Sequence, residues 1–263
     1  MTLKEQIQAE ANVYGTWLRI PHPNLVEILG RSGFDFLHID MEHGPIGMHE
    51  LDSMLLAAKA TGIPAMVRVP QVEESIIGKA LDLGATGVVV PRVNNAHDAL
   101  EAVNAAFFAP LGQRGLGGAC RANDFGKSSF QQFAEEANRQ TVLALQIETK
   151  EAVERIDEIL EVSADATDVY FIGPADLSQS LGVPGQFDNP LLIETIQWVT
   201  KRIQKRGKKV GIHLPNPALA PRFAELGIHY FTSSFDLGIV SEGAKLMLQK
   251  LKQQPQSRDT IQY

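Results

Sequence analysis

Two carboxylates, Glu148 and Asp176, stand at or just after the ends of two consecutive apolar runs, Val142–Glu148 and Asp168–Gly173. If these runs are neighbouring parallel strands, their carboxyl ends meet at one edge of the sheet and bring the two side chains together. No second cysteine and no histidine trio accompanies them, so the pair favours a hard cation such as Mg²⁺ or Mn²⁺. An ion pair of either carboxylate with a lysine or arginine is the alternative.

Charged and titratable side chains also end the earlier apolar runs. Arg68 lies near the end of the third run, and its planar guanidinium suits a carboxylate or a developing oxyanion. A salt bridge to Asp40 or Glu42 is its alternative role. His43 follows Asp40 in the loop after the second run, where a solvated imidazole can act as an acid or a base. His38 is expected instead to pack inside the fold.

Further polar groups at the same strand ends are candidates for binding a small anion. Gln146 alternates with Glu148 along one run and therefore shares its face. Pro174 can begin a helix, so the backbone N–H groups of Ala175 and Asp176 are expected to face the same region. Such a helix start receives a carboxylate or phosphate well.

The elements that must position these residues alternate regularly along the chain. Amphipathic helical patterns separate eight apolar runs, and several helices end in glycine just before the next run begins, as a left-handed cap requires. This alternation predicts a parallel sheet closed as a (β/α)8 TIM barrel. An open doubly wound sheet would need a glycine fingerprint after the first strand, and Pro21-His22-Pro23 stands there instead. The eight predicted strands are 15–20, 34–40, 64–69, 87–91, 142–148, 168–173, 209–213 and 229–232.

Composition limits the class of protein and its partners. The chain has 263 residues, a formal net charge of −7 and a single cysteine, Cys120. An acidic chain without basic clusters disfavours binding to nucleic acid or to an anionic membrane. One thiol excludes an internal disulfide framework and indicates a reducing compartment. Residues 1–13 lack the apolar core of a signal peptide, so a cytoplasmic location is expected.

One connection and one terminus fall outside the regular alternation. The segment 92–141 is long for a barrel connection, and its glycine-rich part, Arg114–Cys120, suits either an anion cradle or a tight surface turn. The polar end 253–263 is expected to be loose. A single barrel domain over residues 1–252, followed by this tail, is therefore predicted.

Several ordered motifs resemble those of the HpcH/HpaI aldolases, which are class II pyruvate aldolases. The resemblance covers about residues 13–250, and together the motifs are strongly specific. It implies a (β/α)8 barrel whose last helix swaps between subunits of a homohexamer. The matching segments are Ile39-Asp40-Met41-Glu42-His43-Gly44-Pro45, Val67-Arg68-Val69-Pro70, Gln146-Ile147-Glu148-Thr149, Phe171-Ile172-Gly173-Pro174-Ala175-Asp176-Leu177-Ser178, Leu81-Asp82-Leu83-Gly84-Ala85 and Arg114-Gly115.

The resemblance also implies the reaction and the metal. It implies reversible cleavage of a 4-hydroxy-2-oxo acid into pyruvate, or a close 2-oxo acid, and an aldehyde. It implies a divalent cation held by Glu148 and Asp176, Mg²⁺ or Mn²⁺ with Co²⁺ as a further candidate, and no organic cofactor. Pyruvate would chelate this cation through its ketone and carboxylate.

Catalytic and binding residues follow from the same resemblance. It implies that His43 takes part in proton transfer, helped by Asp40 and by Asp82 of the partner subunit, and that Arg68 contacts the ketone oxygen. The pyruvate carboxylate would meet the N–H groups of Ala175 and Asp176. The full set of expected substrate contacts is Arg68, Gln146, Ala175, Asp176, Trp17 and His213.

The chain departs from the best-known members of that family at three positions. Met41 stands where those aldolases have glycine, and His213 replaces an aliphatic residue near the aldehyde pocket. Arg19, at the end of the first strand, is also unusual, although a surface salt bridge is its favoured role. His213 and Arg19 together suit a polar or acidic acceptor aldehyde.

Three other functions remain open on the sequence alone. A class I aldolase needs a buried lysine at a strand end, and the nearest candidate, Lys150, is expected to face solvent. A CoA-ester lyase of the citrate lyase β-subunit type would need basic residues for its phosphates, for which only Arg114 and Arg121 stand nearby. A non-catalytic barrel that binds a 2-oxo acid is the third alternative.

Overall fold

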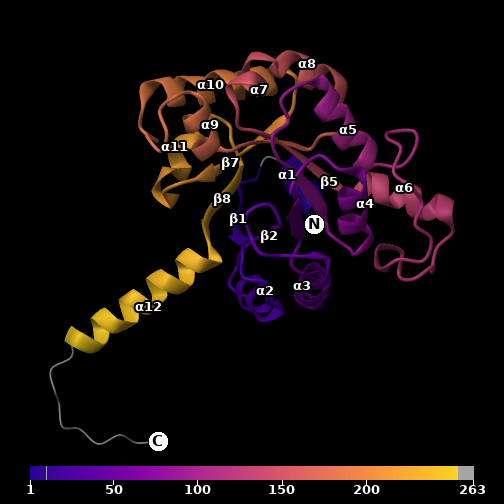
Figure 1. Ribbon diagram of the computed structural model, residues 1–263, viewed down its shortest axis with the longest axis horizontal. Coiled ribbons are helices and arrows are strands. Elements are labelled where there is room, and N and C mark those ends of the chain that lie inside the picture. Colours follow the sequence, from indigo (N-terminus) through magenta and orange to yellow (C-terminus); the bar gives the residue numbers. More distant parts are fainter. Residues whose placement is uncertain (10, 254–263) are drawn as a thin grey trace, which may run out of the picture.

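Eight parallel strands form a closed barrel in the computed structural model, which describes residues 1–9 and 11–253. The strands pair in chain order and β1 closes on β8, so the predicted TIM barrel is confirmed (Figure 1). The strands are β1 (Val13–Leu18), β2 (Phe36–Asp40), β3 (Ala65–Arg68), β4 (Gly87–Val90), β5 (Val142–Ile147), β6 (Val169–Ile172), β7 (Lys209–Leu214) and β8 (Tyr230–Phe235).

Helices follow the strands and cover the outside of the barrel, as the alternation predicts. The helices are α1 (Leu3–Gln8), α2 (Pro23–Gly30), α3 (Met48–Thr61), α4 (Glu74–Asp82), α5 (Ala96–Ala106), η1 (Arg121–Asn123), α6 (Phe130–Gln140), α7 (Lys150–Glu154), α8 (Ile156–Ser163), α9 (Pro174–Ser180), α10 (Pro190–Lys205), η2 (Pro217–Leu219), α11 (Ala220–Ala224) and α12 (Asp236–Gln253).

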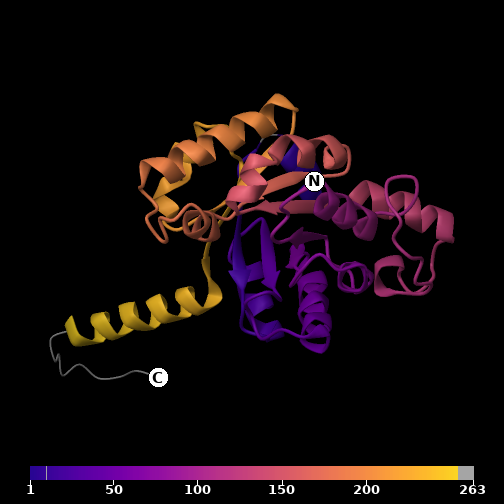
Figure 2. The same ribbon diagram turned by 45° about the horizontal axis from the view of Figure 1, so that its top comes forward.

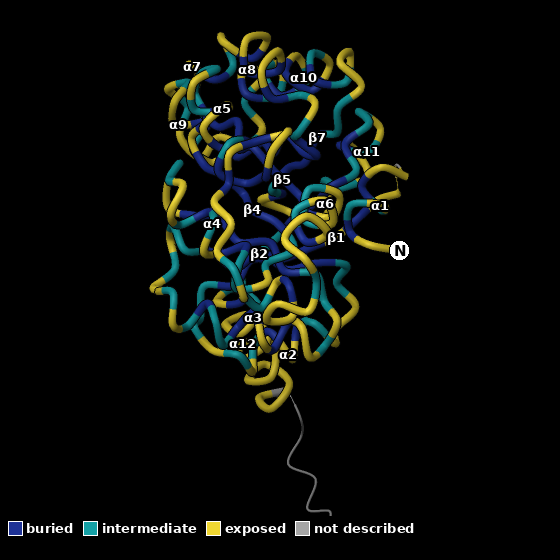
Figure 3. The backbone as a smooth tube through the Cα atoms, turned by 90° about the vertical axis from the view of Figure 1, so that its right-hand side faces the viewer, coloured by how far each residue is buried: buried dark blue, intermediate teal, exposed yellow. Residues whose placement is uncertain are grey.

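Two apolar cores hold the layers together. The larger core lies between the outward faces of the strands and the surrounding helices, and the smaller one fills the barrel interior. The interior core contains Trp17, Phe36, Phe171 and Tyr230, whose rings pack on one another with His38 among them. Figure 3 shows the buried strands at the centre with exposed turns around them. The expected packing role of His38 is confirmed, because its side chain is fully buried.

Local structure differs from the sequence prediction in a few places. The short helix α1 was not expected; it buries Leu3 and Ile7 against the interior core. The connection from β5 to β6 holds two helices, α7 and α8, because Arg155 adopts φ −105° and ψ 15° and ends the first. The connection from β7 to β8 holds η2 followed by α11. The tail predicted over 253–263 lies outside the described residues, apart from Gln253 at the end of α12.

The last helix, α12, contacts the barrel through its first turn, where Ile239 packs against the core, and then projects away from it (Figures 1 and 2). Most of its exposed apolar side chains, all but Leu246, lie along one face at helical spacing, and each is more than half exposed. Within the described residues, no helix combines the length and the apolar character that crossing a membrane requires. The exposed apolar residues of α12 are Leu237, Val240, Leu246, Met247, Leu248 and Leu251.

Candidate active site

An arginine–carboxylate cluster occupies the carboxyl ends of β2 and β3. Asp40 and Arg68 are register partners in these strands, and their side chains are almost wholly buried. Arg68 donates from Nε and Nη2 to the two Asp40 oxygens at 2.8 and 2.6 Å, and its Nη1 lies 3.1 Å from Glu42. Although burial opposes ionisation, the hydrogen bonds and charge of Arg68 hold the pKa of Asp40 below its ordinary value. The guanidinium is therefore fixed in orientation by two acids.

Arg19 joins this cluster from the residue after β1. Its Nε donates to Asp40 Oδ2 at 2.7 Å, and its side chain is 23% exposed. The sequence interpretation of Arg19 as a salt-bridge residue is confirmed, but the pair is not a surface one, because the side chain of its partner Asp40 is fully buried. Glycine at position 44 lets the loop after β2 lie close to the backbone of Arg19, because a Cβ there would meet the Asp40 carbonyl oxygen at 2.4 Å and the Arg19 Cα at 3.2 Å.

His43 stands in the loop after β2, beside this cluster. Its backbone N–H donates to Asp40 Oδ1 at 3.2 Å, and its ring Nε2 lies 3.8 Å from Glu42 Oε2. The side chain is 45% exposed, so its imidazole is open to solvent and to a substrate. This is the position that a general acid or base needs, at the carboxyl ends of the strands and next to a fixed arginine.

Glu148 and Asp176 extend from β5 and α9 on another side of the same mouth. Glu148 is 2% exposed, and burial, followed by the charges of Asp176 and Glu42, raises its pKa to about 7. The backbone N–H of Arg92, a residue held at φ 51°, donates to Glu148 Oε1 at 2.9 Å. A buried carboxylate destabilised by a second carboxylate is the environment that a cation would relieve.

The Gln146 amide beside Glu148 offers a further oxygen that could bind a cation. Gln146 donates to Glu148 Oε2, while its own Oε1 is buried and has no partner among the described residues. The described residues contain no group of three or more histidine, cysteine, aspartate or glutamate side chains arranged for a metal. Glu148, Asp176 and the unpartnered Gln146 oxygen are nevertheless oxygen donors of the kind that Mg²⁺ or Mn²⁺ prefers, and water or substrate would have to complete the coordination.

Gly173 leaves the space in which these donors meet. A Cβ at this residue would lie 2.7 Å from Glu148 Oε2 and 2.9 Å from Gln146 Nε2. We expect Gly173→Ala to displace both side chains, lowering divalent-metal affinity and activity by about 10- to 100-fold, the usual scale for disturbing groups that orient a metal ligand. Metal titration calorimetry and initial rates check this. Gly182→Ala, at an open turn where only backbone strain is added, is the control.

Trp17 links this cluster to β7 and β8. Its ring lies under the Arg68 guanidinium, whose Cζ is 4.3 Å from the ring centroid. Its Nε1 donates to His213 Nδ1 at 3.1 Å and to Thr232 Oγ1 at 2.9 Å. Trp17 and His213, both predicted substrate contacts, therefore lie in the same mouth as Arg68.

Buried histidines give the fold a pH dependence. Burial, followed by the charges of Arg68 and Arg19, lowers the pKa of His213 to about 4, and burial also lowers the pKa of His38. Between the unfolded and folded pKa values the unfolded chain binds more protons, so stability falls as pH falls from about 6.5 towards 4. We expect wild-type protein to lose about 1–2 kcal/mol more than His213→Leu between pH 7 and pH 5.

Denaturant unfolding at pH 7, 6 and 5 measures that difference. His97→Leu removes a histidine that is exposed on α5, so it should keep the wild-type dependence. Parallel pH curves for His213→Leu and the wild type would contradict the prediction.

Asp82 and the basic residues proposed for CoA lie away from this mouth. Asp82 ends α4, on the amino side of β4, and pairs there with Arg114 at 2.6 Å. Arg121 pairs with Asp52 at 2.7 Å. Asp82 therefore cannot join the site of its own chain, and its predicted role requires a second copy.

Lys150 does not have the environment of a Schiff-base lysine. Its side chain is exposed at the start of α7 and its Nζ lies 3.7 Å from Glu154. The expectation that it faces solvent is confirmed. A buried, desolvated amine is what a class I aldolase would need at this place.

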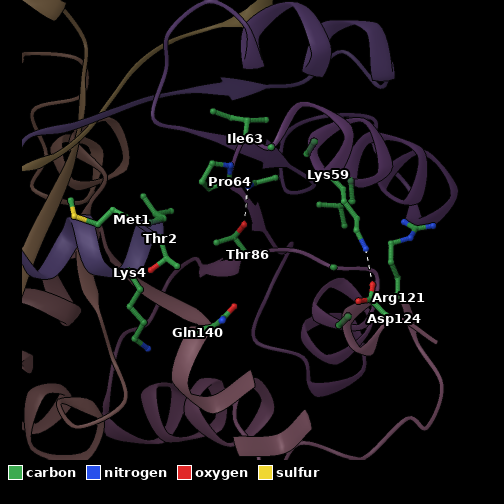
Figure 4. A pocket seen from close by; sticks show the side chains of 17 residues that line it. Met1, Thr2, Lys4, Lys59, Ile63, Pro64, Thr86, Arg121, Asp124 and Gln140 are labelled. Carbon is green, nitrogen blue, oxygen red and sulfur yellow. Dashed lines mark hydrogen bonds and ion pairs between the residues drawn. The ribbon is translucent and has the colours of Figure 1, made fainter. Parts of the chain in front are cut away.

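One cavity of about 550 Å³ lies at the amino ends of the strands, opposite the mouth. Figure 4 shows its lining side chains, with Lys59 paired to Asp124 and Thr86 beside the start of β3. Its other cations, Lys4 and Arg121, are also in ion pairs. Because barrel enzymes place their chemistry at the carboxyl ends of the strands, this cavity is not the candidate active site.

Known proteins with the same architecture share most of this chain. The family model described as HpcH/HpaI aldolase/citrate lyase matches residues 13–242. A hydroxypyruvate/pyruvate aldolase of Roseobacter denitrificans is 36% identical over 253 residues, covering 96% of this chain and 97% of that protein. A 2-keto-3-deoxy-L-rhamnonate aldolase of Klebsiella pneumoniae is 34% identical, covering 93% and 91%.

A solved structure agrees over nearly the whole fold. The crystal structure of an HpcH/HpaI aldolase from Desulfitobacterium hafniense superposes with a TM-score of 0.90 at 31% identity. The match covers 98% of this chain and 100% of that one.

Proposed function

The chain belongs to the HpcH/HpaI aldolase/citrate lyase family, and from that membership we propose that its barrel mouth cleaves a 4-hydroxy-2-oxo acid reversibly to pyruvate, or a close 2-oxo acid, and an aldehyde. The protein is thus a carbon–carbon lyase. The observation that carries the proposal is the Arg68 guanidinium, held by Asp40 and Glu42 within electrostatic range of the buried Glu148. Such a cation suits the developing negative charge of a small 2-oxo acid, provided that a metal ion offsets the charge of the carboxylate pair.

The proposal includes a bound divalent metal ion. Glu148 and Asp176 would hold a divalent cation, Mg²⁺, Mn²⁺ or Co²⁺, without any organic cofactor. When bound, it would supply positive charge next to the 2-oxo group on which the cleavage places electrons. The buried, mutually repelling carboxylates and the unpartnered Gln146 oxygen support this assignment.

The residues of the chain provide the remaining steps. His43 takes the proton from the C4 hydroxyl, directly or through a water, the C3–C4 bond breaks, and the aldehyde leaves. The bond's electron pair passes to the enolate of pyruvate, whose oxygen Arg68 stabilises while Asp40 holds the guanidinium in place. The protonated His43 then delivers a proton to C3, directly or through a water, which gives pyruvate and returns His43 to its starting form. First-turn N–H groups of Ala175 and Asp176, which lack helical partners, bind the carboxylate.

Exchange of the pyruvate methyl protons tests this function without any aldehyde. We expect the protein, with Mg²⁺ in heavy water, to incorporate deuterium at C3 of pyruvate, followed by mass spectrometry. Condensation with an added aldehyde should then yield a 4-hydroxy-2-oxo acid. A protein that pyruvate stabilises thermally, but that neither exchanges these protons nor forms a product, would instead be the non-catalytic binding barrel.

Two rival activities lose support from the site. Arg114 and Arg121, the arginines that the sequence offered for CoA phosphates, are paired with acids on the amino side of the barrel. Lys150 is exposed. A CoA-ester lyase would release an acyl-CoA product, and a class I aldolase would be trapped by borohydride with pyruvate; we expect neither result.

The projecting helix supports a proposal about the assembly. We propose that residues 1–252 form one barrel domain whose α12 packs on another subunit, in a cytoplasmic homohexamer. The exposed apolar face of α12 supports this, since a contiguous apolar patch of this kind marks a protein–protein contact. Asp82 would then reach the mouth of a neighbouring subunit.

Light scattering tests the assembly. We expect a mass about six times that of one chain, and a smaller species for Leu248→Glu, which places a charge on the apolar face of α12. Gln249→Glu, on the same helix turn but at a polar residue, should leave the mass unchanged. A wild-type monomer at micromolar concentration would contradict the proposal.

A further inference from the structure

Three side chains on the β7, β8 and β1 side of the mouth have no part in the cleavage steps. They are Arg19, Phe235 and His213, which we call the Arg19 cluster. The Arg19 guanidinium carbon lies 4.1 Å from the centroid of the Phe235 ring, and the His213 ring centre lies 5.3 Å from the same ring. Phe235 thus contacts both polar neighbours at the strand ends.

Arg19 is fixed by its surroundings and still has donors to offer. Its backbone N–H donates to the buried Asp236 at 3.0 Å, and its Nε donates to Asp40 at 2.7 Å. Its stacking on Phe235 restrains the guanidinium plane. Among the described residues, neither terminal nitrogen of Arg19 has a hydrogen-bond partner. A guanidinium bound only through Nε keeps four N–H donors for a ligand.

Trp17 and Thr232 favour one tautomer of His213. Its Nδ1 lies 3.1 Å from the indole Nε1 of Trp17, which is only a donor, so a hydrogen on Nδ1 would face another hydrogen. The Thr232 hydroxyl, also 3.1 Å from Nδ1, can donate to it, and we therefore assign Nδ1 as the acceptor. A neutral imidazole that accepts at Nδ1 carries its hydrogen on Nε2. Burial keeps the ring neutral at pH 7, because it lowers the pKa of His213 to about 4. Since His213 Nε2 has no partner within the described part of the chain, it is a second available donor.

The barrel order separates this cluster from the carboxylate pair. Glu148 and Asp176 extend from β5 and β6, whereas the Arg19 cluster extends from β7, β8 and β1. Arg68, which would contact the 2-oxo group, stacks on Trp17 between the two regions. With the pyruvate half placed at β5 and β6, the Arg19 cluster faces the half that leaves as the aldehyde.

We propose that the Arg19 cluster binds a carboxylate on the aldehyde half of the substrate, so that the enzyme acts on an acidic aldehyde. This inference rests on the proposed function and specifies its acceptor. The free polar groups of the cluster are donors, and an ionised carboxylate is an acceptor only. A neutral hydroxyl would bring a donor that finds no acceptor there. The Phe235 ring between the donors suits the methylenes that separate carboxylate and aldehyde.

Competing acceptors test the proposal. Condensation of pyruvate is measured with succinic semialdehyde, with pentanal, which replaces the carboxylate by an ethyl group of similar size, and with glyceraldehyde, which is neutral and hydroxylated. We expect wild-type kcat/KM for succinic semialdehyde to exceed that for either neutral aldehyde by tenfold or more. A site built to hydrogen-bond one group rejects analogues that lack it.

Variants then assign that preference to the cluster. Arg19→Met should lower the ratio of kcat/KM for succinic semialdehyde over pentanal by about 10- to 100-fold, through KM, and Arg19→Lys should restore part of it. His213→Leu should lower the ratio by a smaller factor. Arg139→Met and His97→Leu, at exposed positions, are matched controls that should keep it. The ratio within each variant cancels any general loss caused by loosening Asp40.

The outcomes separate this inference from the proposed function. Absence of both pyruvate exchange and condensation would remove the function itself. An enzyme that exchanges pyruvate protons but prefers pentanal or glyceraldehyde, shows no preference, or accepts no carboxylated aldehyde overturns the inference alone. So does an unchanged ratio in folded Arg19→Met or, if that variant fails to fold, in His213→Leu.

Discussion

Arg68→Ala is expected to lower kcat by a hundredfold or more. The guanidinium is the fixed cation next to the developing enolate oxygen, and removing one such preorganised donor typically costs this much. The loss should fall mainly on kcat, because the negative charge develops as the C–C bond breaks. Steady-state rates of pyruvate release from a 4-hydroxy-2-oxo acid, with lactate dehydrogenase as the coupling enzyme, measure it.

Folding must be separated from chemistry in this experiment. Arg68→Ala leaves Asp40 with Arg19 as its ion-pair partner and Glu42 without its guanidinium, so a lower melting temperature is also expected. Arg68→Lys keeps the charge but lacks the fork that grips Asp40 at two atoms, so intermediate activity should result. Normal turnover by a folded Arg68→Ala variant would show that Arg68 has only a structural role at the ends of β2 and β3.

Metal removal is expected to have the largest effect of all. Dialysis against a chelator should reduce turnover to below about one per cent of its starting value, since the charge beside the 2-oxo group supplies several kcal/mol. Adding back Mn²⁺ or Mg²⁺ should restore it. The rate after each addition, measured with each metal in turn, also ranks Mg²⁺, Mn²⁺ and Co²⁺.

Variants of the two carboxylates locate that effect. Glu148→Gln and Asp176→Asn should each fail to recover at metal concentrations that restore the wild type, because each removes an ionised oxygen ligand. Glu151→Gln, an exposed carboxylate on α7, is the matched control and should recover fully. Full activity in excess chelator would remove the metal from the mechanism.

Much of the fold was predictable because its signals are local. Alternating apolar runs and glycine-capped helices specify strands and helices, and right-handed connections leave few ways to arrange eight of them. Polar residues at the ends of those runs, such as Arg68 and Glu148, then fall at one rim. The sequence also presented both alternatives for Arg68; the structure shows the ion pairs with Asp40 and Glu42, and the contact with the 2-oxo group stays a prediction.

What was missed depends on contacts between distant strands. Arg19 was assigned to a surface pair because its partner Asp40 becomes adjacent only when β1 and β2 lie side by side. The bond between Trp17 and His213 requires the closure of β1 onto β8, which no local pattern reports. Arg92 holds Glu148 through its backbone, so its side-chain type gave no signal. The residue type at position 173 was a local indication, since a glycine before Pro174 suggests that no side chain fits there.

Asp236 binds two parts of the molecule that the sequence separates widely. Its buried carboxylate accepts from the N–H groups of Arg19 and Ile20, which follow β1, and from that of Leu237 in the final helix. A movement of α12 relative to the barrel would therefore also move the backbone of Arg19. If such a movement changes the affinity of Arg19 for a substrate carboxylate, binding of that carboxylate changes the affinity between subunits by the same factor, as thermodynamic linkage requires. Selectivity for the aldehyde and assembly of the subunits would then be thermodynamically coupled in this protein.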